Sequence, residues 1–362
     1  MAAPLHNLLR IARIGASCAV AVVCVVVPPA SAQSSSTKPK TAASTKPAPA
    51  APVKSTSTYS AAASNARRVR LANARTAAQM SVPRYKVDEQ GSVVPDVRAE
   101  AAIIYNPSTG QVLWEEKAYD QRSIASITKV MTAVCFLETN PDLAQEIFID
   151  LADVRDANTT YLRAYEKVSV QNLLHLLLIA SDNAAARTLA RVSSYGTQGF
   201  IARMNEKAAE LGLTSTHYAD PSGLLPSNVS SAYDMARLIT YAGDDELISS
   251  IMRTPEYAFR TSRRPVKIYS TNQLLRSTTL DVRGGKTGFI SQAGYCLVTL
   301  LRLPELNQTV AVVVLGAKSN AGRFWETRHL VNWIASRTQV LISRDHAPAP
   351  SPSANAPIDD RR

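Results

Sequence analysis

The stretch that decides the fold is Arg122-Ser123-Ile124-Ala125-Ser126-Ile127-Thr128-Lys129. Ser126 and Lys129 are three residues apart, so on a helix they lie on the same face, one turn apart. A serine hydroxyl is a poor nucleophile until a neighbouring group takes its proton. An unprotonated lysine amine can take it when burial or a second cation lowers the lysine pKa. The apolar run at 130–137 predicts that this pair opens a buried helix.

A Ser-x-x-Lys pair is common, and the same residues would suit a helix N-cap followed by a solvated lysine. Two later motifs favour the chemical interpretation because they follow in the right order. They are Ser181-Asp182-Asn183 and Lys286-Thr287-Gly288. The three motifs together strongly indicate acyl transfer through a serine.

The second motif supplies groups that such a reaction needs. The Ser181 hydroxyl could pass a proton to a leaving nitrogen. The Asn183 amide could hold both the substrate backbone and Lys129. By itself, Ser181-Asp182-Asn183 would equally suit a helix N-cap.

The third motif has the composition of a strand that borders a cleft. Lys286 would supply positive charge, Thr287 a hydroxyl for a carboxylate, and Gly288 room for the substrate to approach. We expect the backbone N–H groups of Ser126 and Phe289 to form an oxyanion hole.

Two other motif interpretations fail. Gly285-Lys286-Thr287 resembles the end of a phosphate-binding loop, but that loop needs a glycine where Leu280 stands. The sequence has no Gly-x-Ser-x-Gly elbow, so a Ser-His-Asp hydrolase is unsupported.

The N-terminus is predicted to be a secretory signal peptide at 1–32. Arg10 and Arg13 precede an apolar run, and a small-residue cleavage site ends at Ala32. The alternative of a membrane anchor is disfavoured because the run is shorter than the about 20 residues that a span needs. We therefore expect cleavage after Ala32 and a periplasmic location.

The next segment, 33–94, is predicted to be a disordered basic tether, because its Ser, Thr, Ala, Pro and Lys residues cannot bury a core. Residues 1–86 contain 12 of the 40 Lys and Arg residues and none of the 29 Asp and Glu residues. The net charge of +11 therefore belongs to the leader and tether, and it gives no support for nucleic-acid binding by the domain. A basic helix at 67–75 could make weak contact with an anionic membrane surface, or the tether could be a solvated spacer.

Residues 95–342 are predicted to be one α+β domain, followed by a disordered tail at 343–362. A β-hairpin signal at 101–115 precedes a mostly helical segment that ends near residue 241. Two apolar, β-branched strands and a closing amphipathic helix end the domain. The simplest assembly is an antiparallel sheet flanked by helices, with a helical insert and a catalytic cleft between insert and sheet.

Five further residues carry expectations of their own. His175 is expected to be a packing residue, because no second ligand occurs at metal spacing. Cys135 and Cys296 are expected to be buried thiols, although a disulfide outside the cytoplasm stays open. Arg323 and Arg328 follow the last strand and are expected to be surface charges on the final helix rather than substrate contacts.

Four runs of the sequence resemble the low-molecular-mass penicillin-binding proteins, which are active-site-serine D,D-peptidases. The resemblance extends from Ala101 to Ile334. The runs are Arg122-Ser123-Ile124-Ala125-Ser126-Ile127-Thr128-Lys129-Val130-Met131-Thr132-Ala133, Ser181-Asp182-Asn183-Ala184-Ala185-Ala186, Asp220-Pro221-Ser222-Gly223-Leu224 and Gly285-Lys286-Thr287-Gly288-Phe289.

This resemblance implies a serine β-lactamase/D,D-peptidase-like fold and no metal or organic cofactor. It implies that Ser126 attacks a D-alanyl peptide bond of peptidoglycan, with Lys129 as the general base and Ser181 as a proton relay. Asn183 would line the opposite wall, and Lys286 and Thr287 would bind the substrate. Peptidoglycan stem peptides and cross-links are the implied partners, and β-lactams the implied inhibitors.

Within this group, the sequence favours an endopeptidase that cuts the D-alanyl–meso-diaminopimelyl cross-link over a D-alanyl-D-alanine carboxypeptidase. Too few residues follow Ile334 for the extra domain and helix of the anchored carboxypeptidases. The stretch Ser227-Asn228-Val229-Ser230-Ser231-Ala232 also looks like that of the small endopeptidases. A β-lactamase and a non-catalytic cell-wall binding protein remain open alternatives.

Overall fold

The computed structural model describes residues 64–71, 78–79, 81–303 and 308–345. The predicted signal peptide at 1–32, part of the predicted tether and the tail from residue 346 lie outside these residues. The boundary expected for the signal peptide therefore stays a prediction, whereas the expected start of the disordered tail at residue 343 is corrected, because the last described helix runs to Asp345.

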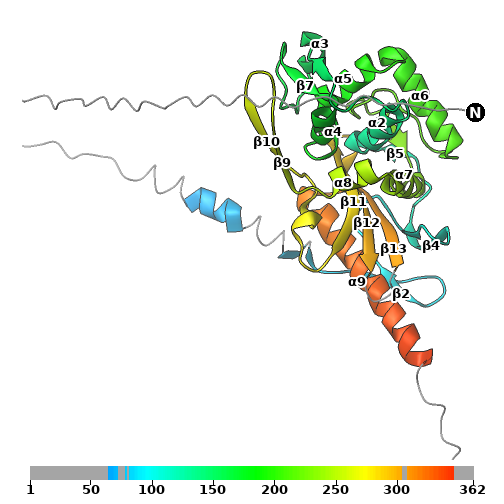
Figure 1. The fold of residues 1–362 in the computed structure, drawn as a ribbon. Coiled ribbons are helices and arrows are strands. Elements are labelled where there is room, and N and C mark those ends of the chain that lie inside the picture. Colours follow the sequence, from blue (N-terminus) through cyan, green and yellow to red (C-terminus); the bar gives the residue numbers. More distant parts are fainter. Residues whose placement is uncertain (1–63, 72–77, 80, 304–307, 346–362) are drawn as a thin grey trace, which may run out of the picture. The chain divides into compact units, whose positions relative to one another are not determined.

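A five-stranded antiparallel sheet forms the centre of the described domain, in the order β11–β12–β13–β3–β4 (Figure 1). Its strands are β3 (Ala101–Asn106), β4 (Gln111–Glu116), β11 (Asp281–Ile290), β12 (Gly294–Leu303) and β13 (Gln308–Ala317). The register pairs Val312 with Ile104, so strands from both ends of the segment meet inside the sheet. The predicted β3–β4 hairpin and the α+β fold class are confirmed.

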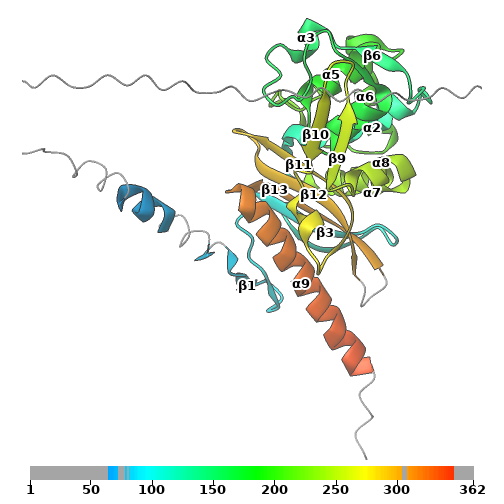
Figure 2. The same cartoon turned by 60° about the vertical axis from the view of Figure 1, so that its left-hand side comes forward.

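The two faces of the sheet pack against different helices, because successive residues of a strand point to opposite sides. Val313 lies in the same core cluster as Ile239 of α7, whereas Val312 clusters with Phe324 of α9. These helices are α7 (Ala232–Asp244) and α9 (Asn320–Asp345). Figure 2 shows α9 running across the strands.

The helical insert is built around α2 (Thr128–Leu137), which is buried along nearly its whole length. Its neighbours are α7 and the helices α4 (Val170–Leu178), α5 (Asn183–Val192) and α6 (Gly196–Glu210). Local sequence signals set the helix starts: Ser169 caps α4 and Ser231 caps α7 by accepting backbone N–H groups.

Short elements complete the insert and its border with the sheet. They are β5 (Arg122–Ser123) paired with β8 (Val229–Ser230), β6 (Glu146–Phe148) with β7 (Lys167–Ser169), β9 (Glu256–Arg260) with β10 (Pro265–Tyr269), α3 (Leu151–Val154), α8 (Glu246–Met252), and the 3₁₀ turns η1 (Ala125–Ile127) and η2 (Gln273–Arg276).

Part of the predicted disordered segment is structured, which corrects the expectation for 85–94. The strands β1 (Tyr85–Val87) and β2 (Val93–Pro95) form a hairpin. Val94 is buried in the α9 core cluster, and the Trp333 Nε1 donates to the Val93 carbonyl at 3.3 Å. Order begins before Pro95 because this apolar residue and backbone carbonyl find partners on a helix that is distant in sequence.

The expectations for the three core residues hold. His175 is a packing residue: its ring stacks on Tyr257 at 3.9 Å, and its Nδ1 lies 2.8 Å from the Gln171 carbonyl oxygen. Cys135 and Cys296 are both buried and free.

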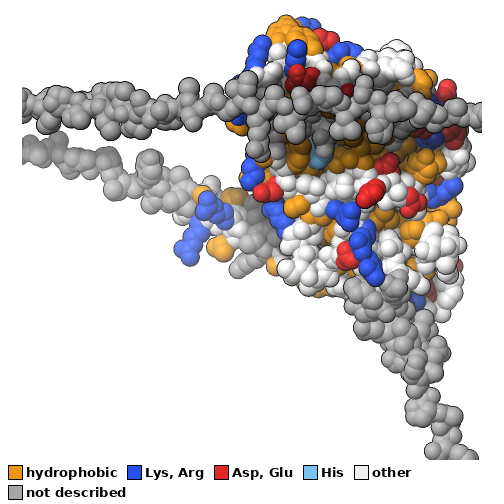
Figure 3. All heavy atoms as spheres, in the orientation of Figure 1, with side chains coloured by type: hydrophobic (Ala, Val, Ile, Leu, Met, Phe, Trp, Pro, Cys, Tyr) orange, Lys and Arg blue, Asp and Glu red, His pale blue; other side chains and the backbone are white. Residues whose placement is uncertain are grey.

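Charge is distributed differently over the described parts of the chain. Residues 64–71 are helical and exposed, and their basic side chains form a blue cluster in Figure 3. On the face of the domain shown there, basic and acidic side chains are interspersed. Of the helices in the described ranges, none has the length and apolar character to cross a bilayer.

Candidate active site

Ser126 lies in the 3₁₀ turn η1, immediately before α2, rather than inside the helix itself. Its neighbours Ala125 and Ile127 are buried, so the turn is fixed from both sides. Ala125 has a φ of +49°, a conformation that costs energy for a residue with a side chain. This turn holds Ser126, half-buried, at the wall of a pocket.

Lys129 lies fully buried beneath Ser126. Its Nζ lies 2.9 Å from the Ser126 Oγ and 2.6 Å from the Asn183 Oδ1, and it also donates to the Ser222 carbonyl. Burial lowers the pKa of Lys129 to about 7, although the carboxylates of Asp220 and Asp182 oppose the shift. Near neutral pH a large fraction of the amine is therefore unprotonated, and its lone pair can accept the Ser126 proton.

The Ser181-Asp182-Asn183 motif joins α4 to α5 and faces Ser126 across the pocket. The Asp182 carboxylate caps α5 by accepting from the Ala185 N–H at 2.9 Å. The N-cap interpretation is therefore correct for Asp182, and it leaves Ser181 and Asn183 free for other contacts. Ser181 has a φ of +61°, which marks strain at a position where the side chain must face the pocket.

The Lys286 side chain is buried on the edge strand β11, next to the pocket residue Ser181. Its Nζ donates to the Ser181 Oγ at 2.7 Å and to the Thr287 carbonyl at 2.9 Å. Burial lowers the pKa of Lys286 well below its usual value, and the nearby cations of Lys129 and Arg323 act in the same direction. The two lysines thus each hold one of the two serine hydroxyls.

Thr287 contacts Thr271, a pocket residue that no sequence motif identifies. Its Oγ1 donates to the Thr271 Oγ1 at 2.6 Å, and both threonines line the pocket. Thr271 lies just after β10, in no recognisable motif, so only the fold brings it here.

The structure gives Gly288 a role in addition to the expected one. A Cβ at Gly288 would lie 2.6 Å from the Ile124 carbonyl oxygen and 3.2 Å from the Ser126 nitrogen. The missing side chain therefore makes room for the backbone of η1, not only for a substrate. Without it, β11 could not lie against the nucleophile turn.

A second glycine supports the same turn from the other side. Gly223 has a φ of +77°, and a Cβ there would lie 2.0 Å from the Ala125 carbonyl oxygen. The Asp220 carboxylate holds this loop by accepting from the Ser222 hydroxyl at 2.6 Å and the Gly223 N–H at 2.8 Å. The loop in turn presents the Ser222 carbonyl to Lys129.

The expectation that Arg323 is a surface charge is wrong. The side chain is buried, and its Nη1 donates to the Gly288 carbonyl at 2.9 Å and the Cys296 carbonyl at 3.1 Å. It also lines the pocket, whereas Arg328 is only half-buried on α9. A guanidinium can enter the interior here because strand carbonyls accept its N–H groups.

The pocket itself has a volume of about 520 Å³. Its lining includes Ser126, Ser181, Asn183, Thr287 and Phe289, and no lining side chain is acidic. With Arg323 in this lining, the site favours a substrate that carries negative charge. The geometry thus brings together all the predicted site residues, while the direction of the Phe289 N–H stays a prediction.

Residues 88–319 match the family model described as D-alanyl-D-alanine carboxypeptidase. The chain belongs to this family. It is a serine D,D-peptidase by this membership, and the described fold agrees with it.

Named relatives of this D,D-peptidase fall into two groups. A D-alanyl-D-alanine endopeptidase of Pseudomonas aeruginosa is 32% identical over 251 residues, covering 68% of this chain and 80% of that protein. The endopeptidase of Escherichia coli is 31% identical over 244 residues, covering 66% of this chain and 78% of that protein. A D-alanyl-D-alanine carboxypeptidase of Escherichia coli is 32% identical over 262 residues, covering 68% of this chain and 63% of its own length.

A solved structure resembles this D,D-peptidase as well. The crystal structure of a Streptomyces DD-transpeptidase is 30% identical and has a TM-score of 0.62, covering 66% of this chain and 97% of that one. The chain of that transpeptidase therefore corresponds almost entirely to the catalytic domain described above.

Proposed function

We propose that the protein is a periplasmic endopeptidase that hydrolyses the D-alanyl–diaminopimelyl cross-link of peptidoglycan. The observation that carries the proposal is the 2.9 Å contact between the Ser126 Oγ and the Lys129 Nζ. It joins a half-buried nucleophile to an amine whose pKa is lowered to about 7 by burial. The relatives named endopeptidase support the choice of bond.

The acylation step uses the groups around the pocket in turn. Lys129 accepts the Ser126 proton while the Oγ forms a bond to the D-alanyl carbonyl carbon. The carbonyl oxygen gains negative charge, which the N–H groups of Ser126 and Phe289 would stabilise. The C–N bond then breaks, and the Ser181 hydroxyl, which Lys286 holds at 2.7 Å, gives its proton to the leaving amine. Ser181 takes up in turn the proton that Lys129 received from Ser126, so Lys129 is again unprotonated.

Hydrolysis of the ester completes the cycle. Lys129 takes a proton from a water molecule, the new hydroxyl attacks the ester carbonyl, and Ser126 leaves with a proton. A β-lactam forms the same ester, but its ring-opened product stays attached and blocks the water. The cations beside the pocket would hold the carboxylate of substrate or β-lactam near Thr287.

A D-alanyl-D-alanine carboxypeptidase is the second candidate. It is favoured by the name of the matching family and by relatives of similar identity that carry that name. The same site serves both reactions, because they differ only in what is attached to the leaving amine.

A substrate digest separates the two candidates. The mature chain from Gln33 and its Ser126→Ala variant are incubated with cross-linked muropeptide dimers and with monomeric pentapeptide, and the products are weighed by mass spectrometry. We expect dimers to become monomers only with the unmodified chain. Loss of one D-alanine from the pentapeptide, with dimers untouched, would establish the carboxypeptidase instead.

We also propose that the basic segment before the domain contacts anionic lipid headgroups weakly. Residues 64–71 support this, since their helix is exposed and carries Arg67, Arg68 and Arg70. Binding to vesicles with anionic lipid should fall when these arginines become glutamine, and it should weaken with salt. Equal binding of both proteins would leave the segment as a spacer.

A further inference from the structure

A second pocket, of about 410 Å³, adjoins the catalytic pocket at the turn between β11 and β12. The two pockets share Phe289, Ser291 and Gln292 as a common wall. Beyond that wall, the second pocket reaches the start of β3, the strand β5 and the end of β13. Apart from the shared wall, its residues have no part in the mechanism above.

Arg122 lines the second pocket and lies four residues before Ser126 in the sequence. Its Nε is shielded from solvent and has no hydrogen-bond partner. Among the described residues, the Glu100 carboxylate attracts the guanidinium electrostatically, but it forms no ion pair with it within 4.0 Å. A charged group that leaves water normally gains an acceptor, so this half-buried guanidinium lacks the partner that its burial requires.

The absence of a side chain at Gly316 leaves space for this guanidinium. Gly316 has a φ of +72°, and a Cβ there would lie 2.5 Å from the Arg122 Nη2. The same Cβ would lie 2.7 Å from the Glu100 Cγ. A glycine at the end of β13 therefore keeps Arg122 at the wall of the pocket.

The charges around Arg122 neutralise it only in part, because the Glu100 carboxylate is attracted by Arg122 but more strongly by Lys318. Glu100 is the acidic residue of the pocket lining, but its carboxylate pairs with Lys318 at the rim. Both side chains of that pair are substantially exposed, at 42% and 57%. Two cations, Arg122 and Lys318, share this one carboxylate, so the pocket lining keeps a net positive charge of one.

An aromatic pair forms the wall between the two pockets. The rings of Phe289 and Tyr295 stack at 4.2 Å, and Phe289 remains 49% exposed. A large exposed ring beside an unpaired guanidinium suits a ligand with an apolar arm that ends in a carboxylate.

We propose that the second pocket binds a free carboxylate of the cross-linked stem peptides on Arg122, while the catalytic pocket holds the scissile bond. The proposal rests on the endopeptidase function and names the feature that would select cross-linked substrates. A cross-linked dimer carries diaminopimelyl carboxylates on both the donor and the acceptor stem. Each is a carboxylate on a short apolar arm, so the same chemistry could come from either stem.

The test uses the mature chain and its Arg122→Gln variant with three dimers: unmodified, amidated on the donor diaminopimelyl carboxylate, and amidated on the acceptor one. We expect Arg122→Gln to lower kcat/KM for the unmodified dimer about tenfold or more, as for a lost charge-assisted hydrogen bond. Amidation of the stem that binds Arg122 should lower kcat/KM of the unmodified chain similarly and abolish the effect of the variant. Acylation by penicillin should stay unchanged, which shows that the variant is folded.

Two further variants sharpen the result. Glu100→Gln removes the pocket's carboxylate and should raise kcat/KM for the unmodified dimer, a gain that misfolding cannot imitate. Arg253→Gln removes an exposed arginine immediately after α8 and should change nothing. If the unmodified chain cleaves dimers but Arg122→Gln and both amidations are without effect, the carboxylate site is wrong and the endopeptidase stands.

A binding arm separates the two proposals. Dimer affinity is measured by calorimetry in the Ser126→Ala background, with and without Arg122→Gln. If the unmodified chain leaves dimers intact, yet Arg122→Gln weakens this binding about tenfold, the endopeptidase is wrong and the carboxylate site stands. If Arg122→Gln leaves this affinity unchanged, the carboxylate site is overturned.

Discussion

At the scale of single residues, the chemistry of the site depends on the burial of two lysine side chains away from water. Lys129 and Lys286 are both buried, and burial lowers the pKa of each. Each one bonds a serine hydroxyl, so the serine facing the substrate carbonyl and the one facing the leaving amine have separate proton partners. The proton affinity of both amines therefore depends on how completely the surrounding residues exclude water from these side chains.

The protonation of Lys129 should control acylation. Because its pKa lies at about 7, the unprotonated base is lost as the pH falls below that value. We expect the rate of acylation by penicillin to fall about tenfold per pH unit below the midpoint and to level off above it. Stopped-flow acylation between about pH 5 and pH 9 measures this, and a rate that is constant over the range would contradict the assignment.

Lys129→Arg keeps a cation at the same position but removes the titratable base. Acylation should fall about 10²–10⁴-fold at every pH, the range expected for loss of a general base. Lys267→Arg, on an exposed strand, is the matched control and should acylate normally.

The glycine beside the nucleophile turn should tolerate no side chain. Gly223→Ala places a Cβ 2.0 Å from a backbone oxygen, so the turn must shift. We expect more than about 3 kcal/mol of destabilisation, or loss of acylation in a folded variant. Gly91 has a similar φ of +79° but open space around its Cβ, so Gly91→Ala should cost only about 1–2 kcal/mol. Equal effects in urea unfolding would show that strain, not contact, matters.

At the scale of elements, local patterns predicted what local forces determine. The β3–β4 hairpin was predictable because its turn residues, Asn106 to Gly110, lie between two runs of strand-forming residues. The burial of Arg323 was not predictable, because carbonyls of β11 and β12 accept its N–H groups after the sheet has formed. The same holds for Thr271 beside Thr287, and for Val94, which is covered only when α9 packs.

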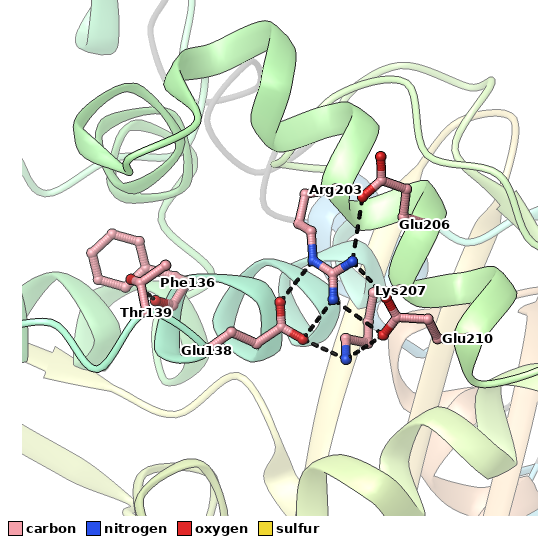
Figure 4. Close-up of polar contacts among 7 residues, drawn as sticks. All are labelled: Phe136, Glu138, Thr139, Arg203, Glu206, Lys207 and Glu210. Carbon is pink, nitrogen blue, oxygen red and sulfur yellow. Dashed lines mark hydrogen bonds and ion pairs between the residues drawn. The ribbon is translucent and has the colours of Figure 1, made fainter.

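An ion cluster joins the C-terminal end of α2 to α6, as Figure 4 shows. The Glu138 carboxylate accepts from both Arg203 and Lys207, and Glu210 pairs with both cations. Burial alone would raise the pKa of Glu138, but the two cations outweigh it and hold the pKa below its usual value.

Arg203→Gln should therefore destabilise the domain by about 1 kcal/mol near neutral pH. The carboxyl pKa is lowered in the folded state, so this contribution is present above the unfolded pKa and is lost as the pH falls through the folded one. Urea unfolding at neutral and acid pH should show the difference shrinking in acid. Glu206→Gln, whose side chain is 65% exposed, is the control and should be nearly neutral. A loss that persists in acid would assign the effect to packing.

At the scale of the molecule, the central sheet joins β3 and β4, from the start of the domain, to β11, β12 and β13, from its end. The β1–β2 hairpin adds a further contact between the two ends, because Val94 packs with α9. Removal of residues 84–95 from the mature chain should lower the free energy of unfolding by about 2 kcal/mol. The loss comes from exposing the site that Val94 covers and from breaking the Trp333 bond to the Val93 carbonyl. Acylation by penicillin should keep its rate, because the hairpin packs on α9, on the face of the sheet opposite α7.

Removal of residues 33–63 is the matched control and should leave the urea midpoint unchanged. If both deletions leave the midpoint where it was, the hairpin contributes nothing to the fold. If the first deletion also slows acylation, α9 transmits the hairpin's packing to Arg323 and through it to β11.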